Sequence, residues 1–501
     1  MKKLILVFLS ICLILTACSR SDGGRAAVTQ GRTDLNMVTQ VNPDSLDPQG
    51  TTMLYSSQVY KNIFATLMRF DANNNLVPCI AESFTSNENS TVFNVTLRRG
   101  IRFHNGEELK ASDVVYTMNR GKNHPFSPMN YPLIERAEVL GDYEVRFTLV
   151  RPYAPFLGVL ATPGFAILSE KATEELGDSF GRNPVGCGPY RFVSWADGEN
   201  IRLSAFDEYF EGPPAIKDVT IRFIADQNTA LIALETGDVD YSYVFPESAK
   251  PDIASSNNLK LQYFDSTALQ FLTLNHDLAP LSNKLVRQAI NLASNRDDII
   301  TVAVEGEGRP TSLFANVNTF GYMDMPGYPH DVQRARALMA EAGYANGFSV
   351  TATAQDAMTR RVVEVFASNM SQIGINVTIE VLESNTAVRN FMTGNYEIGM
   401  LGINNAMLDL DFLKVLFEPN GPLNLANHNN QELYDKFLAA AEPGNSARRL
   451  ELYREINETL LDLAIYVPFF FPLRAHTMNA NLSITHIGGS SIAEIYDMSW
   501  N

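Results

Sequence analysis

"LVPCIAESFTSNENSTVFNVTLRRGIRFHNGEELKASDVVYTMNR", residues 76–120, is the stretch that says most about the fold of this chain. In it, Phe93, Val95 and Leu97 alternate with single polar residues, and a second alternation of the same kind spans residues 145–149. A period of two places every second side chain on one face of a strand. Both segments are therefore predicted to be half-buried, antiparallel strands.

Farther along the chain, apolar residues recur at the helical period of 3.6. This period predicts helices over residues 284–293, 331–343, 361–373 and 450–463. A glycine ends the third of these patterns, and a strand pattern over residues 377–382 follows it. Since strands and helices are mixed and no repeat has the period of a solenoid, the sequence predicts an α/β fold.

Seven more segments extend the pattern of the opening stretch in a fixed order. They are "NPVGCGPYRF" (183–192), "SWADGENIRLSAFDEYFEGPPAIKDVTIRFI" (194–224), "LETGDVD" (234–240), "VRQAINLASNRDDII" (286–300), "RARALMAEAGY" (334–344), "IGINVTIEV" (373–381) and "AIYVPFF" (464–470). With residues 76–120, these segments closely resemble the family 5 extracellular solute-binding proteins of ABC importers, the peptide- and nickel-binding group. The resemblance runs from about Leu46 to the C-terminus.

The resemblance implies a two-lobe α/β fold of the periplasmic-binding-protein type, with hinge strands between the lobes and a solute buried between them. Lobe I would comprise residues 34–270 and 471–501, and lobe II residues 271–470. Lobe I would also contain an inserted subdomain over residues 71–183. Such a protein captures a small solute and delivers it to the transmembrane permease of an ABC importer.

The N-terminus predicts export and lipid attachment. Two lysines precede a short apolar run over residues 5–15, which is typical of a signal peptide spanning residues 1–17. The run leads into "LTACS", a sequence like a bacterial lipobox, so Cys18 is predicted to be lipidated. Residues 18–33 are small and polar and are predicted to tether the body to the membrane. The protein is thus expected outside the cytoplasm, as a lipid-anchored monomer.

Composition narrows the classes of partner. The net charge of −17 argues against binding to nucleic acid. Of the 4 cysteines, only Cys79 and Cys187 lie in the predicted body, where they could pair or stay free. The 7 histidines are scattered, and His104 is interpreted as a structural residue that positions the Asn105-Gly106 turn. No metal, cofactor or enzyme motif is predicted.

The stretch "GINNAMLDLDF", residues 402–412, bears on the solute. In the peptide-binding members the corresponding pattern resembles G-W-x-x-D, and its Asp meets the α-ammonium of the peptide. Gly402 matches the pattern, but Ile403 stands at the Trp position and Ala406 at the Asp position. The amide side chains of Asn404 and Asn405, with that of Gln355 elsewhere, would suit neutral hydroxyl or carbonyl groups.

Two carboxylates follow in the same stretch, and two roles remain open for them. Asp409 or Asp411 could cap the apolar segment that begins at Phe412, because a carboxylate there accepts hydrogen bonds from free backbone N–H groups. Alternatively, Asp409 could meet an ammonium group of the solute. By resemblance, Met53 and Tyr55 would line the wall of lobe I, although both could instead form the apolar face of a helix.

The solute class is also open. The family favours a peptide or a peptide-like solute, whereas an oligosaccharide or a metal chelate would fit the altered 402–412 pattern. Any of four arginines could bind a carboxylate of the solute: Arg360, Arg361, Arg389 and Arg474. The sequence does not show which of them faces the cleft. A different class of protein on the same scaffold, an exported enzyme or a sensory or chaperone-like lipoprotein, is the competing hypothesis.

Overall fold

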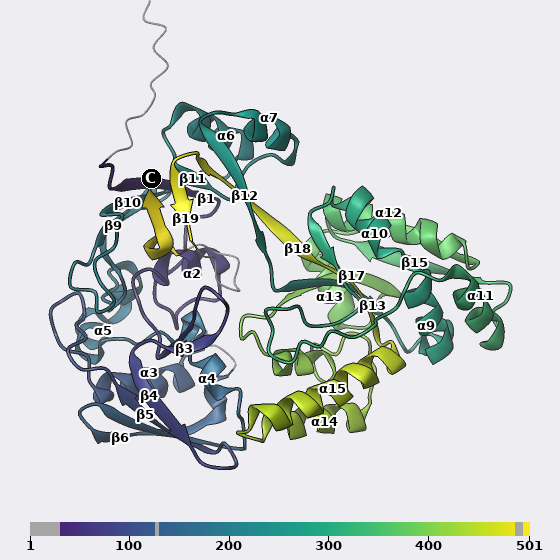
Figure 1. Cartoon of the computed structure of the whole chain (residues 1–501), viewed down its shortest axis with the longest axis horizontal. Helices are drawn as coiled ribbons and strands as arrows, with labels where there is room; N and C mark the ends of the chain where they lie inside the picture. Colours follow the sequence, from purple (N-terminus) through teal and green to yellow (C-terminus); the bar gives the residue numbers. More distant parts are fainter. Residues whose placement is uncertain (1–30, 126–129, 486–493) are drawn as a thin grey trace, which may run out of the picture.

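A computed structural model describes residues 31–125, 130–485 and 494–501. It has two lobes, on the left and right of Figure 1, which are joined by long strands. The predicted signal peptide, the predicted lipidation site Cys18 and most of the predicted tether lie outside the described residues. Within the described ranges, no helix is long and apolar enough to cross a membrane.

One strand belongs to both lobes. The N-terminal part of β18 (Tyr466–Asn479) pairs with β13 (Ala268–Leu274), and its C-terminal part pairs with β12 (Leu259–Asp265). Strands β12 and β13 follow each other with only Ser266 and Thr267 between them. The chain thus crosses between the lobes twice, once from β12 to β13 and once along β18. These two crossings lie side by side and form the hinge strands expected of a two-lobe binding protein (Figure 1).

The sheet continues from the hinge strands into each lobe. Its strands run in the order β16-β15-β17-β13-β18-β11-β1-β10-β9-β8, and β12 and β14 pair with β18 beside this path. In lobe II the strands are β14 (Gly308–Pro310), β15 (Phe348–Ala354), β16 (Ile375–Val381) and β17 (Ile398–Asn404). In lobe I they are β1 (Asp34–Thr39), β8 (Tyr190–Ala196), β9 (Asn200–Ala205), β10 (Asp218–Phe223) and β11 (Tyr241–Ser242).

The helices of lobe II pack their apolar sides into two buried cores. The predicted helices are confirmed as α9 (Lys284–Ala293), α11 (Val332–Glu341), α12 (Ala357–Ser371) and α15 (Ser446–Leu463). The others in this lobe are α8 (Ala279–Ser282), α10 (Arg296–Asp298), α13 (Ser384–Met392) and α14 (Gln431–Ala441). One core lies between the sheet and α9, α11 and α12, and the other between α14, α15 and the segment Leu410–Leu416.

Lobe I contains an additional antiparallel sheet with its own core, in the order β4-β5-β7-β6. Its strands are β4 (Ala81–Ser86), β5 (Val92–Leu97), β6 (Ile134–Gly141) and β7 (Glu144–Leu149), and α3 (Ala111–Asn123) packs on them. Phe93 lies opposite Phe147, which confirms the two predicted antiparallel strands. The other elements of lobe I are α2 (Leu54–Tyr60), β2 (Met68–Phe70), β3 (Leu76–Pro78), α4 (Phe156–Val159), α5 (Glu170–Leu176), α6 (Gln227–Thr236), α7 (Lys250–Ser255), β19 (Leu482–Ile484) and β20 (Met498–Trp500).

The lobes also touch away from the hinge. The hydroxyl of Tyr153, beside α4, donates a hydrogen bond of 2.6 Å to Asp411 of lobe II. The neighbouring N–H of Ala154 donates to the carbonyl of Ala441 over 2.6 Å. The interlobe space is therefore bounded by the hinge strands at one end and by this contact at another.

Three details differ from the sequence interpretation or complete it. His104 is structural, but it bonds to the 183–192 segment: the N–H of Gly186 donates to its Nδ1, and Nε2 lies 3.0 Å from the carbonyl of Gly188. Arg32, assigned to the tether, belongs to the body because it pairs with buried Asp240 at 2.7 Å. Cys79 and Cys187 are both buried and free.

Candidate functional site

A cavity of about 430 Å³ lies where the two lobes and the hinge strands meet. Lobe I contributes polar side chains, the C-terminal half of β18 forms the floor, and lobe II closes one side through Glu307 and Asn404. The polar groups of lobe I and the hinge that line it are Gln40, Tyr55, Gln58, Gln227, Tyr243, Arg474 and His476. A solute in this cavity would contact both lobes.

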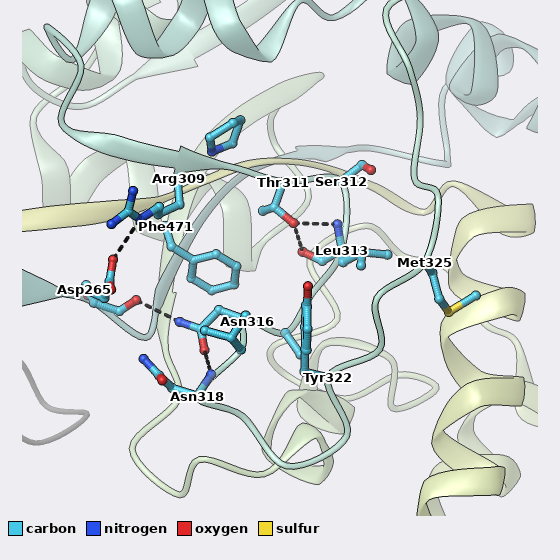
Figure 2. A pocket seen from close by; sticks show the side chains of 14 residues that line it. Asp265, Arg309, Thr311, Ser312, Leu313, Asn316, Asn318, Tyr322, Met325 and Phe471 are labelled. Atoms are coloured by element: carbon cyan, nitrogen blue, oxygen red, sulfur yellow. Dashed lines mark hydrogen bonds and ion pairs between the residues drawn. The ribbon is translucent and has the colours of Figure 1, made fainter. Parts of the chain in front are cut away.

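Figure 2 shows a second cavity, of about 560 Å³. It shares the lining residue Ser266 with the first cavity. The hinge residue Phe471 and a loop of lobe II over residues 309–325 surround it. The Asn316 side chain donates a hydrogen bond of 3.0 Å to the carbonyl of Ser266, which ties this loop to the hinge. Apolar side chains such as Leu313 predominate in the lining, so the cavity suits an apolar group of a solute.

A third cavity, of about 580 Å³, shares Val317 and Asn318 with the second. It extends between lobe II and the inserted subdomain of lobe I, where Phe93 and Pro155 line it. The three cavities follow one another from the hinge toward the second contact between the lobes. We call them together the interlobe cleft.

Neutral hydrogen-bonding groups dominate the lobe I side of the first cavity. The hydroxyl of Tyr243 bonds to Oε1 of Gln58 and lies 3.0 Å from the hydroxyl of Thr39. The hydroxyl of Tyr55 donates to Oε1 of Gln40 over 3.4 Å. These groups are held by one another and still border the cavity, so they are positioned to bond to amide or hydroxyl groups of a solute.

The acidic side chains at this end of the cleft have partners. Glu247 and Glu307 line the first cavity, and both bind the ammonium group of Lys250. Asp265, which lines the second cavity, pairs with Arg309 at 3.0 Å. Asp265 is thus matched by one cation, whereas the two glutamates share one ammonium group and keep a net charge of −1.

Arg474 differs, because it has no ion pair among the described residues. It lies on β18, is exposed to solvent and lines the first cavity. The protein around it removes enough water to lower the pKa of its guanidinium, and no nearby carboxylate counteracts that effect. Of the other arginines weighed from sequence, Arg360 pairs with Glu364 at 2.9 Å and Arg361 donates to the carbonyl of Ala303.

Asp409 caps a helix and forms an ion pair, and it also lines the third cavity. Its Oδ1 accepts from the N–H of Asp411 over 3.0 Å at the start of the segment Leu410–Leu416, which is a 3-10 helix. Arg449 pairs with its Oδ2 at 2.8 Å, and the hydroxyl of Tyr453 donates to Oδ1 over 2.5 Å. With 6% of its surface exposed, Asp409 is a saturated structural carboxylate.

Of the other site residues predicted from the sequence, two line the first cavity and the rest do not. Tyr55 and Asn404 line the first cavity, and Oδ1 of Asn404 accepts from the hydroxyl of Thr267 over 2.8 Å. Met53 lies at the N-terminal end of α2, which confirms the helix there. Gln355 donates a hydrogen bond to the carbonyl of Met400, and Asn405 donates one to the carbonyl of Asp409. Gly402 lies close to the side chain of Gln270 on β13, and Ile403 packs on the core around α14 and α15.

Ala406, at the family's Asp position in lobe II, lines a fourth cavity of about 360 Å³ whose other lining residues belong to lobe I. Asp497 and Glu494 also line this cavity. Burial and the charge of Glu494 raise the pKa of Asp497 to about 6. Among the described residues, no group of His, Cys, Asp or Glu has an arrangement that could hold a metal ion.

Sequence reasoning did not find several residues of the first cavity, among them Gln40, Gln58, Tyr243 and His476. They come from segments far apart in the chain and share no local motif. Only the pairing of β1, β11 and β18 in one sheet brings these segments together.

Comparisons with known proteins agree with this geometry. The model of the family described as "Bacterial extracellular solute-binding proteins, family 5 Middle" matches residues 75–421, which is more than half of the chain. The chain belongs to this family. Its members are extracytoplasmic solute-binding receptors of ABC importers, so the class expected from the sequence is confirmed.

The chain is similar to individual members over most of its length. The glutathione-binding protein GsiB of Salmonella choleraesuis is 26% identical over 462 residues, which cover 87% of this chain and 89% of GsiB. The structure of HbpA2 from Haemophilus parasuis superposes with a TM-score of 0.85 at 23% identity, covering 93% of this chain and 100% of HbpA2. DppA from Helicobacter pylori, in complex with the peptide STSA, has a TM-score of 0.76 at 26% identity and coverages of 93% and 98%.

These relatives are binding proteins by name, not enzymes. The two-lobe α/β fold with hinge strands and an additional subdomain is likewise confirmed by the solved structures.

Proposed function

We propose that this protein is a lipid-anchored receptor that captures a peptide or peptide-like solute in the interlobe cleft and delivers it to an ABC permease. The observation that carries the proposal is the first cavity, which both lobes line and which β18 crosses as a hinge strand. The relatives named for glutathione and for the peptide STSA support a peptide-like solute.

Binding and closure would work together in this receptor. Tyr55 on lobe I and Asn404 on lobe II would bond to opposite sides of the solute, so the solute would stabilise the closed arrangement of the lobes. The apolar second cavity would receive a side chain of the solute. Met53, Gln355, Gly402, Ile403 and Asn405 would support the walls of the cleft.

The lobe boundaries belong to the same proposal. Lobe I is taken as residues 34–270 and 471–501, and lobe II as residues 271–470. Both boundaries would lie at the hinge strands, where β13 and β18 pair at Phe271 and Pro468. Bending at the crossings would then move the lobes as separate bodies.

Lipid attachment at Cys18 would keep the receptor beside its permease, with the mature chain acting as a monomer. Replacing this residue in Cys18→Ala removes the acylation site, so the protein should no longer fractionate with membranes in the producing bacterium. Intact mass of the wild-type mature protein should exceed the mass of residues 18–501 by the attached acyl groups. An unmodified Cys18 would rule out the anchor.

Titration calorimetry on the mature protein tests the receptor role. Glutathione and a set of unmodified tripeptides are the probes, and chromatography with mass spectrometry follows each titration. The proposal predicts saturable binding of at least one probe, with the probe recovered unchanged. Conversion of the probe would favour the enzyme hypothesis, and normal solute import in a strain lacking the protein would favour a sensory or chaperone role.

A further inference from the structure

We propose that Arg474 is the anchor for an anionic group of the solute, so that this receptor selects solutes carrying a carboxylate. This inference rests on the proposed function, because it names the chemical class that the cleft accepts. It assigns the role to a hinge strand, outside the 402–412 stretch where the peptide-binding pattern is altered.

The position of Arg474 is the first support. Its backbone pairs with Phe264 of β12, so the residue lies where the chain crosses between the lobes. Its neighbours Leu473 and Ala475 also line the first cavity, and Asn404 approaches from lobe II. A group bound to the guanidinium would therefore lie between the lobes.

The charge balance of the cleft is the second support. The carboxylates of Glu247 and Glu307 share Lys250, and Asp409 is neutralised by Arg449 at the far end of the cleft. Among the charged side chains that line the first cavity, Arg474 is the one without an ion pair within the described residues. A solute entering this cavity therefore meets a guanidinium that no carboxylate of the described residues binds directly.

Closure of the lobes gives this charge its selective effect. The open cleft still hydrates Arg474, and closure would withdraw that water. A buried guanidinium without a counter-ion is strongly unfavourable, whereas a carboxylate can accept two parallel N–H bonds from it. An anionic solute thus stabilises the closed form, and a neutral or cationic one leaves the charge unmatched.

The surroundings of Arg474 narrow the solute further. His476, two residues along β18, is buried and bonds through Nδ1 to the hydroxyl of Tyr241 at 2.8 Å, and its neutral form adds no competing charge. The amide and phenol groups of Gln58, Tyr55 and Tyr243 match the amide groups of a short peptide. The expected solute is peptide-like and carries at least one carboxylate within reach of the hinge.

The test uses a mixture of random tripeptides without Asp or Glu, half with a free C-terminal carboxylate and half with a C-terminal amide. Immobilised mature protein is exposed to the mixture, and the retained peptides are counted by mass spectrometry. The wild-type protein should enrich the free acids over the amides about 30-fold or more, the ratio expected for one lost buried charge partner.

Three variants locate the effect. Arg474→Gln should lose the preference for the free acids, and Arg474→Lys should keep only part of it, because a lysine retains charge without the planar fork. Arg360→Gln removes an exposed arginine of α12 that pairs with Glu364, and it should behave as the wild type. Unchanged thermal unfolding of each variant without peptide shows that the fold is intact.

The outcomes separate the inference from the proposed function. Equal retention of acids and amides by the wild type, or an undiminished preference in Arg474→Gln, overturns the role of Arg474 and leaves the receptor intact. If neither half is retained, the peptide class in the proposed function is wrong. In that case the solute that co-purifies with the protein tests the role of Arg474. A neutral or cationic solute overturns this role, and an acid that Arg474→Gln no longer retains supports it.

Discussion

At the scale of single residues, the fate of Asp409 shows how a ligand-like carboxylate can be structural. Arg449 and Asp409 are 7% and 6% exposed, and their ion pair is reinforced by the hydroxyl of Tyr453. Burial alone would lower the pKa of Arg449, but Asp409 holds that pKa above its ordinary value. An ammonium group of a solute would therefore compete with Arg449 for this carboxylate, which lines the third cavity.

The variant Asp409→Asn tests this role. Asparagine can still cap the 3-10 helix, yet it leaves the buried guanidinium of Arg449 without a charge partner. The free energy of unfolding should therefore fall by about 3 to 5 kcal/mol in denaturant titration. The matched control, Asp226→Asn at the exposed cap of α6, should change it by less than about 0.5 kcal/mol. Normal stability with weakened binding would instead make Asp409 a ligand residue.

His476 predicts a pH dependence of stability. Burial, with the charges of Arg474 and Lys61, lowers its pKa from 6.5 to about 3. Because the folded pKa lies below the unfolded one, the unfolded chain binds more protons in this interval, and stability is lost as the pH falls below 6.5. Between pH 7 and pH 5 this residue alone should contribute a loss of about 2 kcal/mol. His476→Gln should flatten the curve of unfolding free energy against pH, and an unchanged slope would refute the assignment.

At the scale of elements, the sequence predicts regular segments well and their junctions less well. Helices α9, α11, α12 and α15 follow from apolar residues at the period of 3.6, and β5 and β7 follow from strict alternation. In contrast, no pattern in the sequence predicts β18, which begins within the "AIYVPFF" segment and continues through Asn479 into the other lobe. The two halves of this strand pair with different partners, β13 and β12. Its burial therefore changes along its length, and no single apolar pattern in the sequence marks it as one strand.

The contact between the inserted subdomain and lobe II includes one side-chain hydroxyl, that of Tyr153, bonded to a buried carboxylate. Asp411 is fully buried, its Oδ2 accepts from Tyr153 and Lys414, and its Oδ1 has no hydrogen bond among the described residues. Tyr153→Phe should lower the free energy of unfolding by about 1 to 3 kcal/mol, because a buried carboxylate loses a donor. Chemical denaturation measures this change. Tyr344→Phe, which removes a hydroxyl with no recorded hydrogen bond in the described part of the chain, should have little effect.

The site was only partly predictable for a related reason. Tyr55 and Asn404 could be found because each lies in a segment that resembles the family. Arg474 could be named as a candidate, and the i,i+4 spacing of Arg360 and Glu364 is visible in the sequence, but the bond of Arg361 to the carbonyl of distant Ala303 and the unpaired state of Arg474 are not. Likewise, the burial of Asn405 and the pairing of Asp409 with Arg449 depend on packing between distant segments.

At the scale of the whole molecule, two lobes joined by paired strands can open and close with little change inside either lobe. A solute held from both sides should shift this equilibrium toward the closed form. Small-angle X-ray scattering should therefore show a smaller radius of gyration at saturation with a bound peptide than without it. An identical scattering curve in both conditions would argue against closure as the means of capture.

The most direct test of the account is the identity of the molecule that the protein carries. Freshly purified mature protein is denatured, and the small molecules released are identified by mass spectrometry and compared with the mass difference between the native complex and the bare chain. The account predicts short peptides or a peptide-like compound, each with a carboxylate, and their loss from Arg474→Gln. A neutral sugar or a metal chelate without a free acid, retained equally by the variant, would contradict it.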